Sequence, residues 1–325
     1  MSLLEVKSLK TYYFTQEGVV RAVDGVSFHV NKGEIVALVG ESGCGKTVSM
    51  LSVLCLIKMP GRIVEGEILF NGVNLLKCNE SEMRKIRGCA ISMVFQEPSV
   101  SFDPISTVGN QIVETIQQHQ NIGRQAALEK ATGLLETVNI PDASMRMNNY
   151  PFEFSGGMLQ RIMITLALSC DPQVLIADEP TTALDATAQA QVLEIMKAIV
   201  EKFNIALILI THNLGLVARY CDRVYMMYAG NVVETAPMEE LYANAKHPYT
   251  IGLWASVPRL DRSRKESRLV ALDGEPPNLV KAIRGCPFSP RCKESIAKCF
   301  EEAPTLTAIN DSHYVACHLV SSQLS

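Results

Sequence analysis

The sequence has no long hydrophobic run, no long run of basic residues and no low-complexity tract. No apolar stretch approaches the roughly eighteen residues that a helix needs to span a bilayer, so we expect no transmembrane helix. The N-terminal residues 1–13 mix charged with apolar side chains, and we therefore expect no secretory signal peptide. The formal net charge is −4, which together with the missing basic run argues against a nucleic-acid surface. These absences favour a soluble globular protein.

The 325 residues, 47% of them hydrophobic and 20% charged, suffice for one large α/β domain with a smaller appendage. Strand-like runs at 174–177 and 205–210 flank a helical stretch at 186–203, as a parallel βαβ unit requires. Beyond Tyr249 prolines, charges and cysteines increase, and we place the boundary near Pro258, which predicts domains at 1–257 and 258–325. Further strands are expected at 5–9, 26–30 and 67–70, in an antiparallel sheet, and at 90–95, with a helix at 123–138.

Three glycines lie close together where an apolar strand ends, in the segment VGESGCGKTVSM. Positions 40–47 match G-x-x-x-x-G-K-[ST], a loop whose backbone amides converge on phosphate groups ahead of a helix N-terminus. Lys46 is expected to reach the β- and γ-phosphates of ATP, and the Thr47 hydroxyl to bind Mg²⁺. An ordinary glycine-rich turn is the alternative, but the full match between strand and helix favours a nucleotide site. The expected ATP-binding residues of the loop are Gly40, Ser42, Gly43, Cys44, Gly45, Lys46 and Thr47.

Two acidic residues follow the apolar run at 174–177. Asp178 is expected to hold Mg²⁺, directly or through water, and Glu179 to polarise the attacking water. Capping or turn roles explain many such pairs, but the phosphate loop earlier in the chain favours a catalytic role.

The segment FSGGMLQR places Ser155, Gly156 and Gly157 before an apolar helix. Ser155 and the following amides, with Met158, form a second potential phosphate site at a helix N-terminus. One γ-phosphate hardly needs two such sites, so we expect two chains in a head-to-tail dimer, each completing the other's site. A simple N-cap explains Ser155 alone equally well.

In their order along the chain these motifs resemble those of the ATP-binding subunits of ABC transporters. The resemblance covers residues 3–254 and includes Gln96, the strand VLIADEP, the ALD at 183–185 and His212. It implies the P-loop NTPase fold of ABC ATPases, with a RecA-like core, an antiparallel β subdomain and an α-helical subdomain. To this α/β fold we expect a small C-terminal cysteine-rich domain to be added.

The resemblance also implies individual roles. Tyr13 stacks on adenine, with Tyr12 as the alternative and a core aromatic as the plain explanation. Gln96 touches Mg²⁺ and relays to the membrane subunit, Asp185 lines the dimer interface and His212 contacts the γ-phosphate. The expected catalytic residues are Glu179, His212, Gln96 and Lys46. The expected Mg²⁺ ligands are Thr47, Gln96 and Asp178.

The signature departs from the general LSGGQ of the family, because Phe154 and Met158 stand at its ends. The form EFSGGM is similar to the peptide-transporter branch. The segments HPYT, SVPRL, GCPFSPRC and HYVACH resemble the C-terminal region of oligopeptide and dipeptide importer ATPases, a branch that also includes nickel and oligosaccharide systems.

The chain has ten cysteines, but ATP chemistry and the expected lack of a signal peptide indicate a reducing cytosol, where disulfides are rare. Six cysteines are scattered and are assigned to core packing. The other four, all in the C-terminal region, are Cys286, Cys292, Cys299 and Cys317.

Metal binding explains these four thiols better than disulfides do. Zinc could also use His313 and His318, but the short C-x₂₋₄-C spacing of structural zinc is absent. The segment CKESIAKC predicts a helix, which separates Cys292 and Cys299 by roughly 10 Å and favours a four-iron cube over one ion. The tails of some members of the resembling branch bind such a [4Fe–4S] cluster. Nothing in the sequence places it near Lys46 or Glu179.

We therefore expect an ATPase that drives a peptide importer. The expected partners are a second ATPase subunit, a paralogue in a heterodimer, two membrane permease subunits and, indirectly, an extracellular peptide-binding protein, with no nucleic acid. The chain is expected at the cytoplasmic face of the cell membrane as a peripheral subunit. The alternatives are a soluble ABC ATPase acting on DNA or ribosomes, and a cluster-based sensor regulated by ATP.

Overall fold

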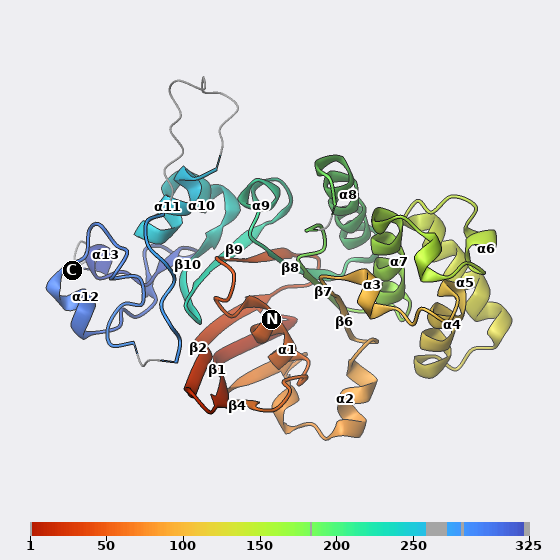
Figure 1. Cartoon of the computed structure of the whole chain (residues 1–325), viewed down its shortest axis with the longest axis horizontal. Coiled ribbons are helices and arrows are strands. Elements are labelled where there is room, and N and C mark those ends of the chain that lie inside the picture. Colours follow the sequence, from red (N-terminus) through yellow and green to blue (C-terminus); the bar gives the residue numbers. More distant parts are fainter. Residues whose placement is uncertain (1, 183, 258–271, 281–282, 322–325) are drawn as a thin grey trace. The chain divides into compact units, whose positions relative to one another are not determined.

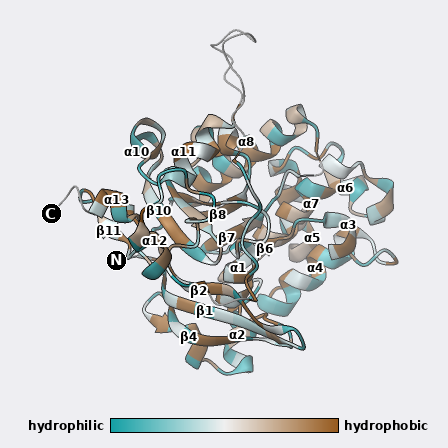
Figure 2. Cartoon of the chain, turned by 60° about the vertical axis from the view of Figure 1, so that its left-hand side comes forward, coloured by the Kyte–Doolittle hydropathy of each residue, from teal (hydrophilic) through white to brown (hydrophobic). Residues whose placement is uncertain are grey.

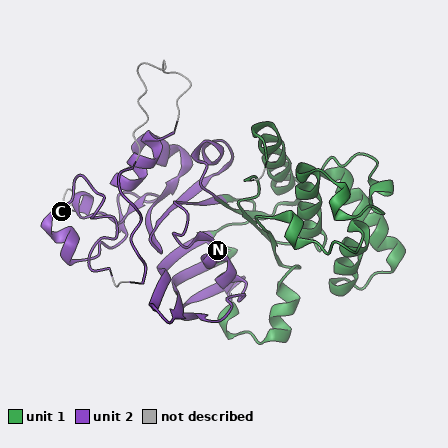
Figure 3. Ribbon diagram, viewed as in Figure 1, with its two compact units in different colours: residues 1–4, 30–35, 74–210 green, residues 5–29, 36–73, 211–325 purple. Residues whose placement is uncertain are grey.

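A computed structural model describes residues 2–182, 184–257, 272–280 and 283–321. Contacts within the chain divide it into two compact units (Figure 3). Unit 1 consists of residues 1–4, 30–35 and 74–210, and unit 2 consists of residues 5–29, 36–73 and 211–325. The predicted domain boundary at residue 258 lies outside the described residues.

Unit 1 contains a parallel sheet. Its strands are β6 (Ile91–Val94), β7 (Val174–Asp178) and β8 (Ala206–Thr211). β7 pairs in parallel with both β6 and β8, and all three strands are buried along their whole length. Continuous apolar runs of this kind are typical of parallel strands that are covered on both faces. The helix α8 (Ala186–Phe203) connects β7 to β8, which confirms the predicted βαβ unit.

Among the remaining helices of unit 1, α3 to α7 lie together and form its α-helical part, and α2 lies apart from them (Figure 1). These remaining helices are η1 (Leu75–Lys77), α2 (Glu80–Ile86), α3 (Pro98–Ser101), α4 (Val108–His119), α5 (Arg124–Thr137), α6 (Ala143–Arg146), η2 (Pro151–Glu153) and α7 (Gly156–Leu168). The helices α4, α5 and α7 contact one another. α4 buries Ile112, Val113 and Ile116 on one side, and Figure 2 shows apolar and polar residues alternating along this helix. Helix–helix packing therefore holds this part together.

Unit 2 contains a four-stranded sheet in the order β2-β1-β4-β5. The strands are β1 (Leu4–Thr15), β2 (Gly18–Val30), β4 (Gly61–Phe70) and β5 (Val73–Asn74). The predicted strands at 5–9, 26–30 and 67–70 all lie within these longer elements. The inner side chains, among them Val6, Val26 and Ile68, are fully buried.

Unit 2 also contributes strands in the order β11-β12-β10-β9-β3. Their bounds are β3 (Ile35–Val39), β9 (Arg223–Tyr228), β10 (Asn231–Pro237), β11 (Thr307–Ala308) and β12 (Tyr314–Val315). β3 is parallel to β9, and the other pairs are antiparallel. The helices of unit 2 are α1 (Lys46–Val53), α9 (Leu214–Tyr220), α10 (Met238–Asn244), α11 (Pro248–Ala255), α12 (Ala297–Glu301) and α13 (His318–Ser321).

The C-terminal segment extends this sheet. β12 pairs with β10 through Val315 opposite Glu234 and Tyr314 opposite Thr235, and β11 continues the sheet beyond β12. The predicted separate cysteine-rich domain is therefore not supported. The physical reason is that a segment with few large apolar side chains cannot bury a sufficient core of its own. It gains backbone pairing and burial by joining an existing sheet. In the described part of the chain, no helix is long and apolar enough to cross a membrane.

Candidate functional site: a phosphate loop and an acidic strand end

The phosphate loop joins the buried strand β3 to the helix α1, as predicted. Gly43 and Gly45 have φ angles of 78° and 101°, which L-side chains rarely adopt. A Cβ on Gly45 would come within 2.2 Å of the Ala22 carbonyl oxygen, and one on Gly40 equally close to that of Met227. Both contacts are with backbone, so the glycines are required for the course of the loop.

Lys46 lies inside this loop and is buried. Its Nζ donates hydrogen bonds to the carbonyl oxygens of Gly40, at 2.7 Å, and Glu41, at 2.9 Å. The Cys44 thiol next to it is buried too, and burial raises its pKa. The loop therefore holds one buried cation beside the first helical turn, which carries Thr47. This arrangement can bind a polyphosphate.

The acidic pair lies at the end of β7. Asp178 is buried, and Glu179 has a φ of 45°, a left-handed conformation, with its backbone N–H donating to the Ile210 carbonyl at 2.9 Å. The Glu179 Oε2 accepts hydrogen bonds from Thr182 Oγ1 at 2.8 Å and from Gln96 Nε2 at 3.3 Å. The structure thus brings together Gln96 and Glu179, which the sequence separates widely. Two donors fix the direction of the carboxylate.

The signature segment begins α7. The Ser155 Oγ accepts from the Met158 backbone N–H at 3.4 Å, so Ser155 does act as an N-cap. Ser155 and Gly156 are exposed, and a Cβ on Gly156 would meet nothing within 4 Å. The first residues of this helix are therefore accessible to a ligand or partner.

Asp185 caps α8 in the same manner. Its Oδ1 accepts from the backbone N–H groups of Thr187 and Ala188, each at 3.0 Å. The residue is exposed. Ala183, the first residue of the predicted ALD motif, lies outside the described residues.

Three further predicted residues lie in unit 2. The Tyr12 hydroxyl donates to Asp24 Oδ1 at 2.5 Å, whereas the Tyr13 ring packs against Gly61, where a Cβ would lie 2.6 Å from it. Both tyrosines are half-buried. His212 directly follows β8 and is exposed.

The predicted residues fall into two sets. Gln96, Ser155, Asp178, Glu179 and Asp185 belong to unit 1. The phosphate loop, Tyr13 and His212 belong to unit 2.

Sequence reasoning missed the C-terminal contacts of the phosphate loop. Arg291, next to Cys292, forms an ion pair with Glu41 of the loop at 2.7 Å, and the Tyr249 hydroxyl accepts the Glu41 backbone N–H at 2.9 Å. The sequence placed nothing from the cysteine region near the loop. A single arginine far along the chain gives no signal for such a contact.

The four C-terminal cysteines lie near one another. Cys286, Cys299 and Cys317 are buried, and Cys292 is half-buried. Burial, with a smaller contribution from the thiols of Cys299 and Cys317, raises the pKa of Cys286 to about 11. Burial likewise raises the pKa of Cys292, with the same two thiols adding to the effect. Cys299 and Cys317 are therefore within electrostatic range of both Cys286 and Cys292.

The helix predicted across CKESIAKC is wrong at its start. α12 begins only at Ala297, and Cys292 lies in a turn in which its N–H donates to the Phe288 carbonyl at 3.0 Å. Of the helix residues only Cys299 is buried, which is too little packing to stabilise a longer helix. Within the described ranges, no three His, Cys, Asp or Glu side chains are grouped so as to hold a metal ion.

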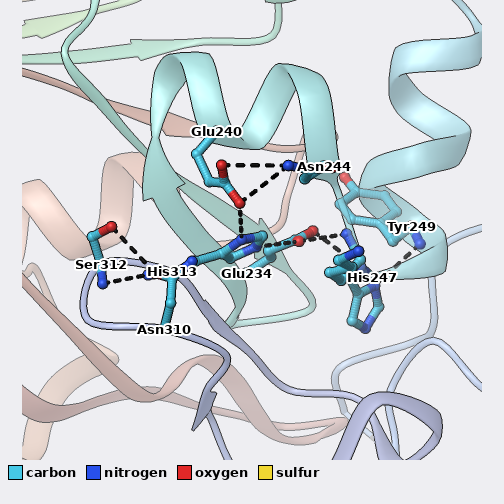
Figure 4. A network of polar contacts seen from close by, with 9 residues as sticks. Glu234, Glu240, Asn244, His247, Tyr249, Asn310, Ser312 and His313 are labelled. Carbon is cyan, nitrogen blue, oxygen red and sulfur yellow. Dashed lines mark hydrogen bonds and ion pairs between the residues drawn. The ribbon is translucent and has the colours of Figure 1, made fainter. Parts of the chain in front are cut away.

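A buried polar network ties the C-terminal segment to β10 (Figure 4). His313 Nε2 lies 2.8 Å from Glu234 Oε1, and both side chains are fully buried. The same carboxylate accepts the backbone N–H groups of Lys246, at 2.6 Å, and His247, at 3.1 Å. His313 Nδ1 lies 3.4 Å from Glu240 on α10. One carboxylate therefore connects the C-terminal segment with the start of α11.

Comparison with known proteins adds independent information. A sequence model of the family "ABC transporter" matches residues 23–182, and one of the "Oligopeptide/dipeptide transporter, C-terminal region" matches residues 233–299. The chain is 48% identical over 316 residues to a probable peptide ABC transporter ATP-binding protein of Sinorhizobium fredii, a match that covers 97% of this chain and 94% of that protein. It is 46% identical over 318 residues to the dipeptide transport ATP-binding protein DppD of Bacillus subtilis, covering 98% of this chain and 94% of the relative.

Solved structures show the same fold. A dimeric ATP-binding cassette in a post-hydrolysis state, bound to ADP and Pi, superimposes with a TM-score of 0.65 at 24% identity. The match covers 72% of this chain and 98% of that cassette. The fold is therefore that of the ABC ATPases.

Proposed function

Because the chain belongs to the ATP-binding subunits of ABC transporters, in their oligopeptide/dipeptide branch, we propose that it hydrolyses ATP to drive the import of di- or oligopeptides. The observation that carries this function is the match of residues 233–299 to the C-terminal region of such transporters, in a chain with a complete phosphate loop. It favours a peptide importer over an ATPase that acts on DNA or ribosomes and over an ATP-regulated sensor.

Phosphate binding and metal binding are assigned to separate residues. Lys46 compensates the charge of the β- and γ-phosphates, and the loop amides donate to them. Mg²⁺, when bound, would neutralise the charge that develops during transfer, and Thr47, Asp178 and Gln96 would hold it. Carboxylate, hydroxyl and amide oxygens are the ligand types that Mg²⁺ prefers. Tyr13 stacks on the adenine.

Glu179 is the general base. Its carboxylate is oriented by Thr182 and Gln96, so it can accept a proton from a water at a fixed position. His212 contacts the γ-phosphate. The hydrogen bond between Gln96 and Glu179 supports a coupled movement of the metal ligand and the base.

Hydrolysis takes place in a head-to-tail dimer. Exposed Ser155 and Gly156, with half-buried Gly157 and Met158, act on the partner's nucleotide from the start of α7, and exposed Asp185 lines the interface. A related cassette, 24% identical, was solved as a dimer. We favour a paralogous ATPase as the second subunit, with the substrate chosen by the permease and the binding protein.

The chain associates peripherally with two membrane permease subunits at the cytoplasmic face. Two strongly exposed apolar side chains, Val100 and Ile105, lie in the segment directly after Gln96. Exposed apolar side chains close to a metal ligand suit a contact that reports nucleotide state to a permease. An extracellular peptide-binding protein acts through that permease.

The C-terminal thiols fit an iron–sulfur cluster. What supports the proposal is that the thiols of Cys299 and Cys317 influence the pKa of both Cys286 and Cys292. A cubic cluster takes four thiolates at corners farther apart than the ligands of one ion. Cys286, Cys292, Cys299 and Cys317 would hold the cluster, which would supply a structural cross-link. Protein purified without oxygen should be brown with about four irons per chain, and colourless protein with one zinc would contradict the assignment.

The function is tested in proteoliposomes. The chain is reconstituted with its permease subunits and partner ATPase, and ATP hydrolysis is measured with candidate binding proteins loaded with peptides, nickel or oligosaccharides. Stimulation by a peptide-loaded binding protein supports the proposal. Stimulation by a nickel-loaded or sugar-loaded protein alone would contradict peptide import but leave the ATPase intact.

A further inference from the structure

Glu41 is the second residue of the phosphate loop, and its carboxylate, backbone N–H and carbonyl all form hydrogen bonds. Its carboxylate takes two hydrogen bonds from Arg291, Nη1 to Oε2 at 2.7 Å and Nη2 to Oε1 at 3.0 Å. Its N–H donates to the Tyr249 hydroxyl at 2.9 Å, and its carbonyl accepts from Lys46 Nζ at 2.9 Å. Two of these three partners come from the C-terminal part of the chain.

Arg291 is itself rigidly held. Its Nε donates to the Asp273 carbonyl at 2.9 Å, and Nη1 also donates to the Tyr228 hydroxyl at 3.2 Å. The guanidinium lies over the rings of Tyr228 and Phe288, and its side chain is only 5% exposed. A planar, two-pronged contact of this kind fixes the orientation of the carboxylate as well as its distance.

Tyr249 provides the second contact that holds Glu41 in place. The residue is fully buried, with its ring centroid 4.7 Å from that of Tyr228 and 5.5 Å from that of Phe288. Its N–H donates to Nδ1 of His247, the N-cap of α11, at 3.1 Å (Figure 4). Arg291 and Tyr249 thus share one aromatic cluster, and Phe288 of the C-terminal segment packs within it.

We propose that Arg291 is a positioning residue for ATP binding, which sets the course of the phosphate loop through the carboxylate of Glu41. The inference rests on the proposed function of this loop as the ATP site. A phosphate loop binds because successive amides converge on one point. Displacement of Glu41 would move the two carbonyls to which Lys46 is bonded, and with them the cation of the loop. The C-terminal segment, described above as an appendage to the sheet, is then part of the nucleotide site.

The test compares variants of the full-length protein. Arg291→Ala removes both bonds to Glu41, and Arg291→Lys keeps the charge but not the two-pronged geometry. The matched control is Lys293→Ala, which removes an ion pair two residues away, to Asp273 at 2.9 Å, with side chains 75% and 73% exposed. Binding of a fluorescent ATP analogue, KM, kcat and thermal unfolding are measured for each.

We expect Arg291→Ala to bind ATP about tenfold more weakly and to raise KM similarly, the lower end for one hydrogen bond to a charged group. The kcat should stay close to wild type, because Glu179 and His212 are untouched. Arg291→Lys should fall between wild type and Arg291→Ala, and Lys293→Ala should match wild type. A purely structural role would lower the unfolding temperature without this separation of KM from kcat.

A double-mutant cycle with Glu41→Gln tests whether Arg291 acts through Glu41. If Arg291 acts through Glu41, the double variant should bind ATP no more weakly than the weaker single variant. Additive losses, or wild-type ATP affinity in folded Arg291→Ala, would overturn the proposal. Should Arg291→Ala fail to fold, Arg291→Lys and Glu41→Gln provide the same cycle. A wild-type protein that neither binds nor hydrolyses ATP would instead contradict the proposed function.

Discussion

Removal of the His313 imidazole should loosen the C-terminal segment where it joins the sheet. The side chains of His313 and Glu234 are both fully buried, so solvent does not screen their contact at 2.8 Å. In His313→Ala the Glu234 carboxylate keeps only the N–H donors of Lys246 and His247 and loses its buried positive partner. Breaking one partner of a buried pair costs about 3 kcal/mol at the low end.

Hydrogen exchange measures how firmly the C-terminal segment is attached to the sheet. The Ala316 N–H donates to the Val233 carbonyl at 2.8 Å, and β12 pairs with β10, so a peptide over residues 314–317 reports the docked state. A loss of about 3 kcal/mol corresponds to about 10²-fold faster exchange, if opening is local. Asp311→Ala, an exposed change in the same loop, is the control. Unchanged protection in His313→Ala would refute the reasoning.

The stabilisation that His313 contributes should decrease as the pH rises. Burial opposes the charge on His313, but the hydrogen bonds and charges of Glu234 and Glu240 outweigh it and raise its pKa above 6.5. The extra stabilisation is therefore complete below pH 6.5 and is lost as the pH rises through the raised value. Burial lowers the pKa of His247 to about 4, so that group destabilises the fold as the pH falls from 6.5 towards 4. The difference between wild type and His313→Ala isolates the first effect, and it should decrease with rising pH.

The remaining predictions concern catalysis and the dimer. Glu179→Gln should hydrolyse ATP about 10²–10⁴-fold more slowly while binding it normally, measured as phosphate release and nucleotide affinity; wild-type turnover would remove Glu179 from the role of base. Ser155→Arg should abolish ATP-dependent dimerisation, measured by light scattering, yet leave the ATP affinity of the monomer nearly unchanged, because Ser155 acts only on the partner's nucleotide. Equal loss of both would mean that Ser155 is only the N-cap of α7.

Local motifs were predictable from the sequence because their physical causes are local. Gly40 and Gly45 are required by backbone contacts at 2.2 Å, and this requirement appears in the sequence as the spacing of the loop. The strand at 174–177 and the helix at 186–203 follow from apolar runs and periodicity, and both are present with nearly the expected bounds. The acidic pair at the end of β7 is located by the same reasoning.

The C-terminal segment was less predictable because long-range contacts decide its structure. The sequence suggested a separate cysteine-rich domain, and it could not show that β12 instead pairs with β10. Arg291 and Glu41 are 250 positions apart, and neither residue type signals a partner. The helix expected from Cys292 fails for a related reason, since only Cys299 of α12 finds a buried position.

The two attachments of the C-terminal segment act on different parts of unit 2. His313 holds it to β10 and α10, and Arg291 connects it to the phosphate loop, with the cysteines 286–317 along the same stretch. If docking of this segment strengthens ATP binding by some factor, thermodynamic linkage requires ATP to strengthen docking by the same factor. The C-terminal segment, including its four cysteines, is then ordered most firmly when nucleotide is bound. A segment with too little apolar surface to fold alone can gain its order from the ATP site in this way.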